Sequence, residues 1–474
     1  YMKLPDHVDA ALRQAKRNPE EVSRQLEVLR QGPTFISLTR PCTRHDGIVV
    51  VDEADFEQLE SRHQLAARGG RLSSFIPASG ASSRLFQTLL RLFGEEGALR
   101  LDGLKTRYKD GERWLGEPIL LLRRLNELAV WPVGDVGDDY RAALKVLFED
   151  LALAGQPKGL IPFHRYPNCI RTAVEEHLAE CMALGIQRVH FTISDNARER
   201  FSPFLRPNVS FSFQHASTDT PSLDLEGQPV YRDDGSLLFR PGGHGALLHN
   251  LDLLGGDVVL IKNIDNVVTD DHREPIVAWR RRLVGFLLQW EEEVHRLAER
   301  AKEGEDVLEE AVALCGLSMP DLEGQARSAQ ALEMLKRPLR VCGMVANEGQ
   351  AGGGPFWVGD QVQIVEGACI DGNDPDQAAI VGASTHFNPV DMVCSLRDFR
   401  GSQFALSQFA DNSTSMVARK SYRGQPLWAL ELPGLWNGAM AGWLTKFVEI
   451  PPSLFNPVKT LSDLLSPAHR VQRS

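Results

Sequence analysis

Residues 72–84 read Leu-Ser-Ser-Phe-Ile-Pro-Ala-Ser-Gly-Ala-Ser-Ser-Arg, a short apolar segment followed by a loop of small residues. Leucines at helical spacing follow at once, at Leu85, Leu89 and Leu92. We therefore expect a strand, a small-residue loop and a helix. In such a connection, successive backbone N–H groups and the N-terminus of the helix can bind a phosphate. Small residues also join strands to helices for structural reasons alone, and the GxxxxGK[ST] pattern of a P-loop is absent.

Strand and helix patterns alternate farther along the chain. Helices are expected at 172–184 and 245–254, and strands at 187–193 and 257–262. The last of these, Asp-Val-Val-Leu-Ile-Lys, is almost continuously apolar, which is typical of a strand buried on both faces of a parallel sheet. The alternation predicts an α/β fold with a mixed, mostly parallel sheet flanked by helices.

The expected organisation has three parts. Residues 1–70 form a helical N-terminal segment, and residues 71–300 form a nucleotide-binding α/β domain that contains a helical insertion at about 86–156. Residues 301–474 begin with a helical linker and continue as a Gly- and Pro-rich α/β part that completes the substrate site. A length of 474 residues is compatible with two to four domains.

Composition narrows the functional classes. Apolar residues make up 43% of the chain and charged residues 24%, and no apolar run is long enough to span a bilayer. The formal net charge is −11, and the sequence contains no long Lys/Arg block, which argues against nucleic acid as a partner. Seven scattered cysteines without a CxxC pair indicate neither a disulfide framework nor a zinc site. We therefore expect a cytoplasmic protein with no membrane partner.

One lysine and one aspartate stand where they could act on phosphates. Lys158 follows a proline and precedes a short apolar stretch, whereas Phe-Asn-Pro-Val-Lys459 near the C-terminus is by itself compatible with an ordinary proline-bearing turn. Asp265 follows the buried strand, at the end of an open α/β sheet where ligands bind and where a carboxylate can hold Mg²⁺. Each residue alone is also compatible with an ordinary role, as a solvated lysine or a capping aspartate.

A glycine-rich stretch, Phe239-Arg-Pro-Gly-Gly-His-Gly-Ala246, precedes an expected helix. Glycines at this density allow a backbone to approach a ring or a phosphate closely. A tight turn with an incidental histidine is the alternative.

In this order along the chain, these stretches resemble the UDP-sugar pyrophosphorylases. Pro157-Lys158, Phe213-Gln214, the Pro-Gly-Gly-His-Gly loop and Asp265-Asn266 match motifs of that family, and the match through Lys459 to Ser462-Asp-Leu-Leu465 is the most detailed. The chain is also similar, over nearly its whole length, to a bacterial family known as domain of unknown function 4301, grouped with nucleotidyltransferases. This resemblance implies a GT-A-like, Rossmann-type sheet.

The reaction that the resemblance implies is attack by a sugar 1-phosphate on the α-phosphorus of a nucleoside triphosphate, with UTP as the expected nucleotide and Mg²⁺ as cofactor. The implied metal ligands are Asp265 and, as a second candidate, Asp391. The implied catalytic cations are Arg84, Lys158 and Lys459. The implied nucleotide-binding residues are Ala78, Ser79, Gly80, Ala81, Ser82, Ser83, Gln214, Gly242, Gly243, His244 and Asn266.

The sequence departs from the family pattern in two places. Serines stand at Ser79 and Ser82, where the family loop has glycines, so the backbone must form the phosphate-binding turn with Cβ atoms present. About seventy residues separate Arg84 from Lys158, which are far closer in typical members. We interpret 86–156 as an insertion, because a short strand and a helix are expected after Lys158.

Two other functions are compatible with the sequence. A GT-A glycosyltransferase would use a sugar nucleotide and would usually show an Asp-x-Asp at its metal. Here the strand ends in Asp265-Asn266, and Asp374-Pro-Asp376 lies in a polar turn, so this function ranks second. A non-catalytic nucleotide-binding regulator would explain the serine replacements. The sequence leaves open the sugar, the preferred nucleotide and the oligomeric state.

Overall fold

The computed structural model describes residues 4–132, 134, 136, 137, 139–349 and 353–471. The chain divides into two compact units whose segments alternate along the sequence. Unit 1 contains Tyr1–His63, Phe213–Ile261 and Leu283–Pro451, and unit 2 contains Gln64–Ser212, Lys262–Arg282 and Pro452–Ser474. Each of the three parts expected from the sequence is therefore shared between the two units.

The largest group of strands in unit 1 follows the order β2-β3-β19-β12-β16-β11. Its first four strands are parallel to their neighbours, whereas β16 and the short β15 are antiparallel to β12. The central strand, β12, is buried over nearly its whole length, which places it in the core. The bounds are β2 (Thr43–Arg44), β3 (Gly47–Val49), β19 (Leu444–Glu449), β12 (Leu339–Ala346), β16 (Asp391–Ser395), β11 (Val258–Lys262) and β15 (His386–Phe387).

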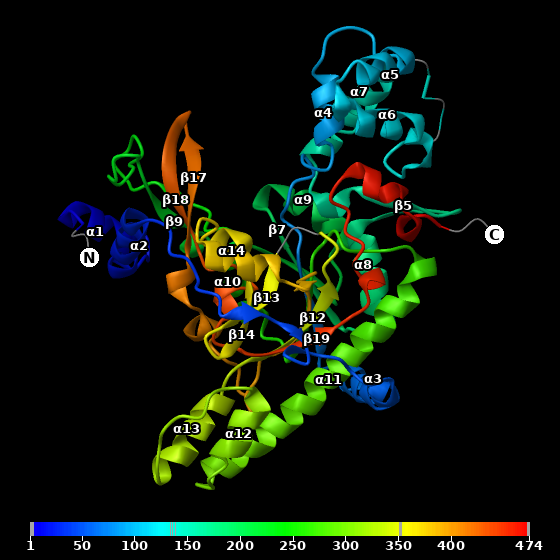
Figure 1. The fold of residues 1–474 in the computed structure, drawn as a ribbon. Helices are drawn as coiled ribbons and strands as arrows, with labels where there is room; N and C mark the ends of the chain where they lie inside the picture. Colours follow the sequence, from blue (N-terminus) through cyan, green and yellow to red (C-terminus); the bar gives the residue numbers. More distant parts are fainter. Residues whose placement is uncertain (1–3, 133, 135, 138, 350–352, 472–474) are drawn as a thin grey trace. The chain divides into compact units, whose positions relative to one another are not determined.

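Two antiparallel sheets complete the strands described in unit 1. One has the order β10-β9-β18-β17 and includes a long hairpin, and the other has the order β1-β13-β14 (Figure 1). Their bounds are β10 (Phe239–Arg240), β9 (Thr220–Leu223), β18 (Gln425–Glu431), β17 (Met416–Tyr422), β1 (Arg40–Pro41), β13 (Gly354–Val358) and β14 (Gln361–Val365).

The N-terminal helices of unit 1 cover the sheet that contains β9. Apolar residues of α1 and α2, such as Leu12 and Leu26, form one core cluster with Leu223 and Leu430. The side chain of Asn18 accepts a hydrogen bond from the Glu20 amide and so caps α2, where Pro19 takes the first position. Helices of unit 1 are α1 (Asp6–Gln14), α2 (Pro19–Gln31), α10 (Leu247–Leu254), α12 (Leu308–Cys315), α13 (Gln325–Leu335) and α14 (Pro375–Gly382).

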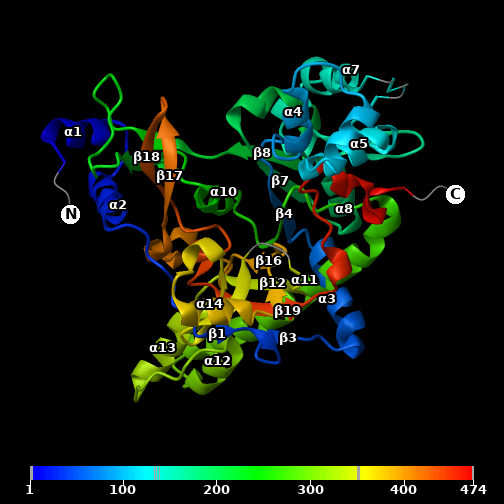
Figure 2. The same cartoon turned by 45° about the horizontal axis from the view of Figure 1, so that its top comes forward.

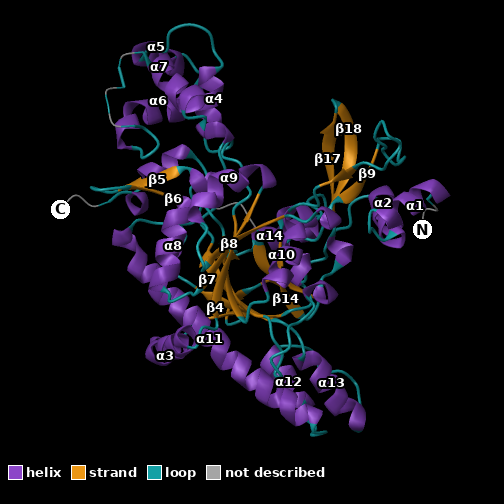
Figure 3. Ribbon diagram, turned by 180° about the vertical axis from the view of Figure 1, so that it is seen from behind, coloured by secondary structure: helices purple, strands orange, loops and turns teal. Residues whose placement is uncertain are grey.

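Unit 2 contains the strands β4-β7-β8, with β4 and β7 parallel (Figure 2). A separate pair is formed by β5 and β6. The segment 86–156 is helical, and its helices α4–α7 form one group (Figure 3). The bounds are β4 (Leu72–Pro77), β5 (Pro162–Arg165), β6 (Ile170–Thr172), β7 (Arg188–Ile193), β8 (Val209–Phe213), α4 (Gln87–Phe93), α5 (Leu101–Lys109), α6 (Gly116–Arg123), α7 (Tyr140–Lys145), α8 (Ala173–Ala183) and α9 (Arg198–Phe201). Two helices have residues in both units, α3 (Phe56–Arg68) and α11 (Asp270–Lys302).

The predicted fold class, a mixed and mostly parallel α/β fold with flanking helices, is confirmed. One local expectation was wrong. A short strand was expected directly after Lys158, but the structure has a 3-10 turn at Lys158–Leu160. The strand begins only at Pro162 and pairs with β6. Proline lacks an N–H donor and is tolerated at the first position of a strand, which explains the later start. Among the described residues, no helix is both long and apolar enough to cross a bilayer.

Candidate functional site

The loop after β4 presents free backbone amides. Ala78 still donates to the Thr192 carbonyl and continues the sheet. Within the described chain, the amides of Ser79, Gly80, Ala81 and Ser83 have no hydrogen-bond acceptor. These four residues are exposed, whereas Ala78 and Ser82 are buried. Such a row of unpaired amides next to a helix is suited to binding an anion.

The serine at position 82 does not obstruct this loop. Its side chain is fully buried, and its Oγ lies 2.6 Å from the Leu153 carbonyl oxygen and 2.8 Å from that of Gln156. The hydroxyl thus fastens the loop to the end of the helical segment 86–156. The side chain of Ser82 therefore points inward and stabilises the turn.

The segment carrying Lys158 runs directly along the small-residue loop. The Lys158 amide donates to the Gly80 carbonyl at 2.9 Å, and the Ser82 amide donates to the Gln156 carbonyl at 3.1 Å. Ala81 and Pro157 form an antiparallel bridge. The chain therefore leaves the loop at Arg84, forms the helices of 86–156 and returns beside its starting point.

Asp265 joins the two lysines. Its Oδ2 accepts a hydrogen bond from Lys158 Nζ at 2.8 Å and another from Lys459 Nζ at 2.9 Å. Burial alone would raise the pKa of this carboxyl, but the charges of Lys158 and Lys459 outweigh burial and hold the pKa below its ordinary value. The second oxygen, Oδ1, is buried and has no hydrogen-bond partner among the described residues.

The C-terminal segment is fastened to the Asp265 turn on both sides of Lys459. The Val458 amide donates to the Asp265 carbonyl at 2.9 Å, and the Asn456 amide donates to Asn266 Oδ1 at 3.0 Å. Beyond the lysine, the Leu461 amide donates to the Leu85 carbonyl at 3.2 Å. Four stretches far apart in the sequence therefore meet within unit 2.

Asp463 explains why Ser-Asp-Leu-Leu follows Lys459. Its carboxylate accepts hydrogen bonds from the amides of Lys459 and Thr460, both at 2.8 Å, and so caps the short 3-10 helix Leu461–Leu465. The sequence match included Asp463 without a role, although a Thr followed three residues later by an acidic residue is a recognisable capping pattern.

Arg84 lies at the surface of the same unit, at the end of the amide row. In the part of the chain that the structure describes, its guanidinium makes neither an ion pair nor a hydrogen bond. Arg84 is thus an unpaired cation next to unpaired amides. Asn266 also keeps a buried Nδ2 without a hydrogen-bond partner among the described residues.

A buried network under the Asp265 turn was missed by sequence reasoning. His177 of α8 donates from Nε2 to the Ile264 carbonyl at 3.0 Å. Glu180 accepts from Lys262 Nζ at 2.8 Å and also pairs with Arg280. Burial lowers the pKa of His177 to about 3, so its ring is neutral at pH 7. The residues that flank Asp265 in sequence are therefore rigidly held.

The glycine-rich loop lies in unit 1, next to the turn that follows Gln214. A Cβ at Gly242 would lie 2.5 Å from the Thr218 carbonyl oxygen, and a Cβ at Gly245 would lie 2.0 Å from that of Pro433. Gly243 has a φ of +76°, a left-handed conformation. Close backbone approach within the protein thus accounts for these glycines.

The matched pair Gly245→Ala and Gly80→Ala tests this interpretation. We expect Gly245→Ala to lose about 1–3 kcal/mol of unfolding free energy, because its Cβ meets main-chain oxygen. Gly80→Ala should stay within about 0.5 kcal/mol of the parent, since its Cβ would meet open space. Urea unfolding of both variants measures the difference, and equal midpoints would contradict the packing role of Gly245.

His244 is fixed by three neighbours in unit 1. The Leu435 amide donates to its Nδ1 at 3.1 Å, which leaves the ring proton on Nε2, where it faces Glu366 Oε1 at 3.4 Å. The ring stacks on Trp436, with centroids 5.5 Å apart. The contact with His244 lowers the pKa of Glu366.

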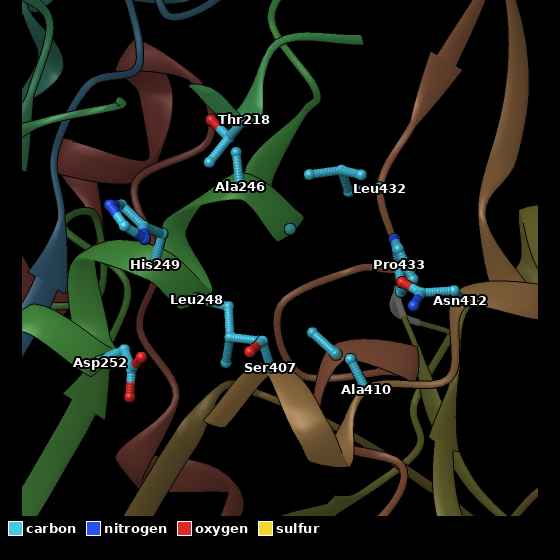
Figure 4. A pocket seen from close by; sticks show the side chains of 12 residues that line it. Thr218, Ala246, Leu248, His249, Asp252, Ser407, Ala410, Asn412, Leu432 and Pro433 are labelled. Atoms are coloured by element: carbon cyan, nitrogen blue, oxygen red, sulfur yellow. The ribbon is translucent and has the colours of Figure 1, made fainter. Parts of the chain in front are cut away.

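A pocket of about 250 Å³ opens beside this loop. Figure 4 shows residues of α10 facing residues 407–412 and 432–433 across it. Asn250 of α10 donates to the Phe213 carbonyl at 2.8 Å and so holds the chain just before Gln214. Gln214, the glycine loop and this pocket therefore belong to one region of unit 1.

The two remaining carboxylate candidates lie in unit 1. Asp391 is buried at the start of β16. Asp374 accepts hydrogen bonds from the amides of Asp376 and Gln377 and caps α14, so Asp-Pro-Asp is a helix start. Across the described residues, no three His, Cys, Asp or Glu side chains are grouped as a metal site.

Comparison with known families identifies the chain. The family described as a domain of unknown function (DUF4301) matches residues 6–114 and 135–470. The chain belongs to this family. The membership predicted from the sequence is confirmed. No protein of curated function matches the chain.

Two solved structures similar to this member of the DUF4301 family are named as pyrophosphorylases of UDP-sugars. One is the uridine diphosphate N-acetylglucosamine pyrophosphorylase of Trypanosoma brucei in complex with an inhibitor, at 15% identity and a TM-score of 0.48, covering 94% of this chain and 74% of that one. Another is a mutant UDP-glucose pyrophosphorylase of Leishmania major in complex with UDP-glucose, at 12% identity and a TM-score of 0.46, covering 98% and 79%.

Proposed function

We propose that this protein is a nucleotidyltransferase that joins a nucleoside triphosphate, preferentially UTP, to a sugar 1-phosphate and releases pyrophosphate. The observation that carries the proposal is the meeting of Lys158 and Lys459 on Asp265, beside the amide row that ends at Arg84. Several cationic groups and one carboxylate in one place suit a polyphosphate substrate.

The chemistry asks little of the protein beyond charge and position. The attacking oxygen of a sugar 1-phosphate is already an anion, so no general base is required. Arg84 and the amides of Ser79, Gly80, Ala81 and Ser83 would bind the β- and γ-phosphates, and Lys158 and Lys459 would neutralise charge around the reacting α-phosphate. These four amides have no acceptor within the described chain, so binding a phosphate breaks no hydrogen bond of theirs, whereas the Ser82 amide already donates to the Gln156 carbonyl.

Asp265 suits Mg²⁺ as a cofactor. Its Oδ2 serves the two lysines, while the buried Oδ1 lacks a partner, and Mg²⁺ is commonly held by one or two carboxylates together with substrate phosphates and water. Bound there, the ion would neutralise phosphate charge and orient the triphosphate. Asp391 remains the second candidate ligand. When substrate enters, the lysines can exchange the carboxylate for phosphate oxygens.

The base and ribose would lie at Gly242, Gly243 and His244, with Gln214 and the adjoining pocket nearby. The Nδ2 of Asn266 would supply a further donor. The serine at position 82 favours neither loss of function nor a purely regulatory role, because its side chain is turned away from the amide row. Asp374 caps a helix, so Asp374-Pro-Asp376 gives no support to a glycosyltransferase.

The test is pyrophosphate release from each of the four nucleoside triphosphates with a panel of sugar 1-phosphates and Mg²⁺. Release with at least one pair, greatest with UTP, is expected. Sugar transfer from a nucleotide sugar without pyrophosphate release would instead identify a glycosyltransferase. Nucleotide binding without either reaction would identify a regulator.

The two lysines should separate catalysis from stability. Lys459 is 58% exposed in its side chain, and an ion pair this exposed contributes about 0–1 kcal/mol to folding. We therefore expect Lys459→Ala to lower kcat roughly 10²–10³-fold while the unfolding midpoint hardly moves. Lys145→Ala, which removes a lysine of similar exposure in the same unit, is the control and should keep full activity. Equal kcat values for the two variants would contradict the role of Lys459.

A further inference from the structure

A chain of buried polar side chains lies at the base of the loop that carries Lys459. His164 Nδ1 is 2.9 Å from Glu176 Oε1, and His164 Nε2 is 2.9 Å from His469 Nδ1. His164 and Glu176 are at most 1% exposed, and His469 is 4% exposed. The main chain of Asn456 also interacts with the His469 ring. His469 thus contacts both the core and the opposite end of its own loop.

These contacts close the segment 456–469 into a loop. Asn456, at its start, is bonded to Asn266, and Ala468, at its end, accepts a hydrogen bond from the Thr269 amide at 3.1 Å. Lys459 lies between these two attachment points, three residues from the first. The position of its ammonium on Asp265 therefore depends on how firmly both ends are held.

The core end of the chain is rigid. Besides His164, Glu176 accepts hydrogen bonds from Tyr166 Oη at 2.8 Å and from Arg273 Nη2 at 2.6 Å, and Arg171 lies 3.5 Å away. Because Glu176 accepts a hydrogen bond from His164 Nδ1, the direction of this hydrogen bond in the buried series of side chains is defined. Burial and the neighbouring His164 lower the pKa of His469 to about 3, so this ring remains neutral at pH 7.

A buried polar chain is a costly way to fill space. Burying three polar side chains costs desolvation free energy, and apolar residues of similar volume often stabilise a fold equally well or better. What hydrogen bonds provide is a defined geometry, because a fully bonded network admits few arrangements. Their place at the base of the Lys459 loop is where geometry matters most for the proposed reaction.

We propose that His469, anchored through His164 to Glu176, is a positioning residue that holds the Lys459 loop on Asp265. This inference rests on the proposed function for its catalytic consequence, but the contact itself can be tested without turnover. His469 does not touch the reacting groups and acts through Lys459.

The catalytic test is a double-mutant cycle with His469→Phe and Lys459→Ala. The phenylalanine keeps the ring volume and removes both polar contacts. We expect His469→Phe to lower kcat roughly 10- to 100-fold in the parent, with the KM for the triphosphate nearly unchanged. In the Lys459→Ala background it should change kcat by less than about twofold, because the group that it positions is gone. Equal losses in the two backgrounds would show a general structural role and overturn the proposal.

The structural test is hydrogen exchange of the full chain, followed on peptides from 455–470. His469→Phe should accelerate exchange in these peptides and leave those of β4 unchanged; unchanged exchange at 455–470 would overturn the proposal. His469→Ala, which leaves a cavity in place of a ring, is the second variant and must show the same dependence on Lys459. If the parent protein releases no pyrophosphate, the proposed function fails, while hydrogen exchange still decides whether His469 holds the loop.

Discussion

Asp265→Asn is expected to reduce pyrophosphate release by at least about a thousandfold. The substitution preserves the shape of the side chain and removes the charge that holds Lys158 and Lys459 together. It also removes the anionic oxygen proposed to bind Mg²⁺. The fold should persist, because asparagine still accepts hydrogen bonds at Oδ1 and the Lys459 ammonium can return to water.

The matched control for this variant is Asp195→Asn. Asp195 lies in the same unit, is 79% exposed and pairs with Arg198 at 3.2 Å, so it undergoes the same chemical change without touching the site. Steady-state kinetics measure kcat, and circular dichroism checks the fold. An Asp265→Asn variant that turns over at the parental rate would refute both the metal role and the charge-neutralising role of this residue.

The protein is also expected to lose stability steeply in mild acid. His177, His190 and His469 are buried in unit 2, and burial is the main cause that lowers their pKa values to about 3, about 4 and about 3. In the unfolded chain they titrate near 6.5, so the unfolded state binds more protons as the pH falls below that value. Their contribution to stability is therefore complete above pH 6.5 and is lost on acidification toward pH 4.

The slope follows from the number of protons taken up on unfolding. Near pH 5, three histidines are protonated in the unfolded chain and neutral in the folded one, which gives about 4 kcal/mol per pH unit. Urea unfolding at several pH values between 7 and 5 measures it. His190→Asn, which can still bond to Ser210 or Ser212, should lower the slope by about one third. The substitution His7→Gln, at an exposed position, should leave this slope unchanged. A slope well below about 4 kcal/mol per pH unit in the parent would contradict the claim that the three buried histidines are neutral in the folded protein.

Local sequence patterns determined the elements on which the site is built. The apolar run 257–262 predicted a buried strand ending near Asp265, and the small residues 78–83 predicted a loop between a strand and a helix. The pattern at 172–184 predicted the helix observed as α8 (Ala173–Ala183). These predictions succeed because periodicity, capping and turn preferences act over a few residues and are therefore written in contiguous sequence.

The motif order indicated which of these elements belong together, and the structure brings Lys158 and Lys459 into contact with Asp265. The sequence could not reveal how they are held. Ser82 bonds to carbonyls more than seventy residues away, and His164 meets His469 across 305 positions. No feature of the sequence around His164, a single histidine in β5, predicts that its partner is His469.

What the sequence alone determined was thus the type of the main elements around the site, the family and the residues with the right charge. Only the tertiary structure decided that Asp265 accepts hydrogen bonds from both lysines at Oδ2 and leaves Oδ1 without a partner among the described residues. It also decided that the glycines of 242–245 make room for the main chain of their own unit, and that His469 closes the Lys459 loop. The physical reason is that strand and helix formation depends on neighbours along the chain. The partner of a buried polar group, in contrast, is chosen by packing among segments that meet only after the chain has folded.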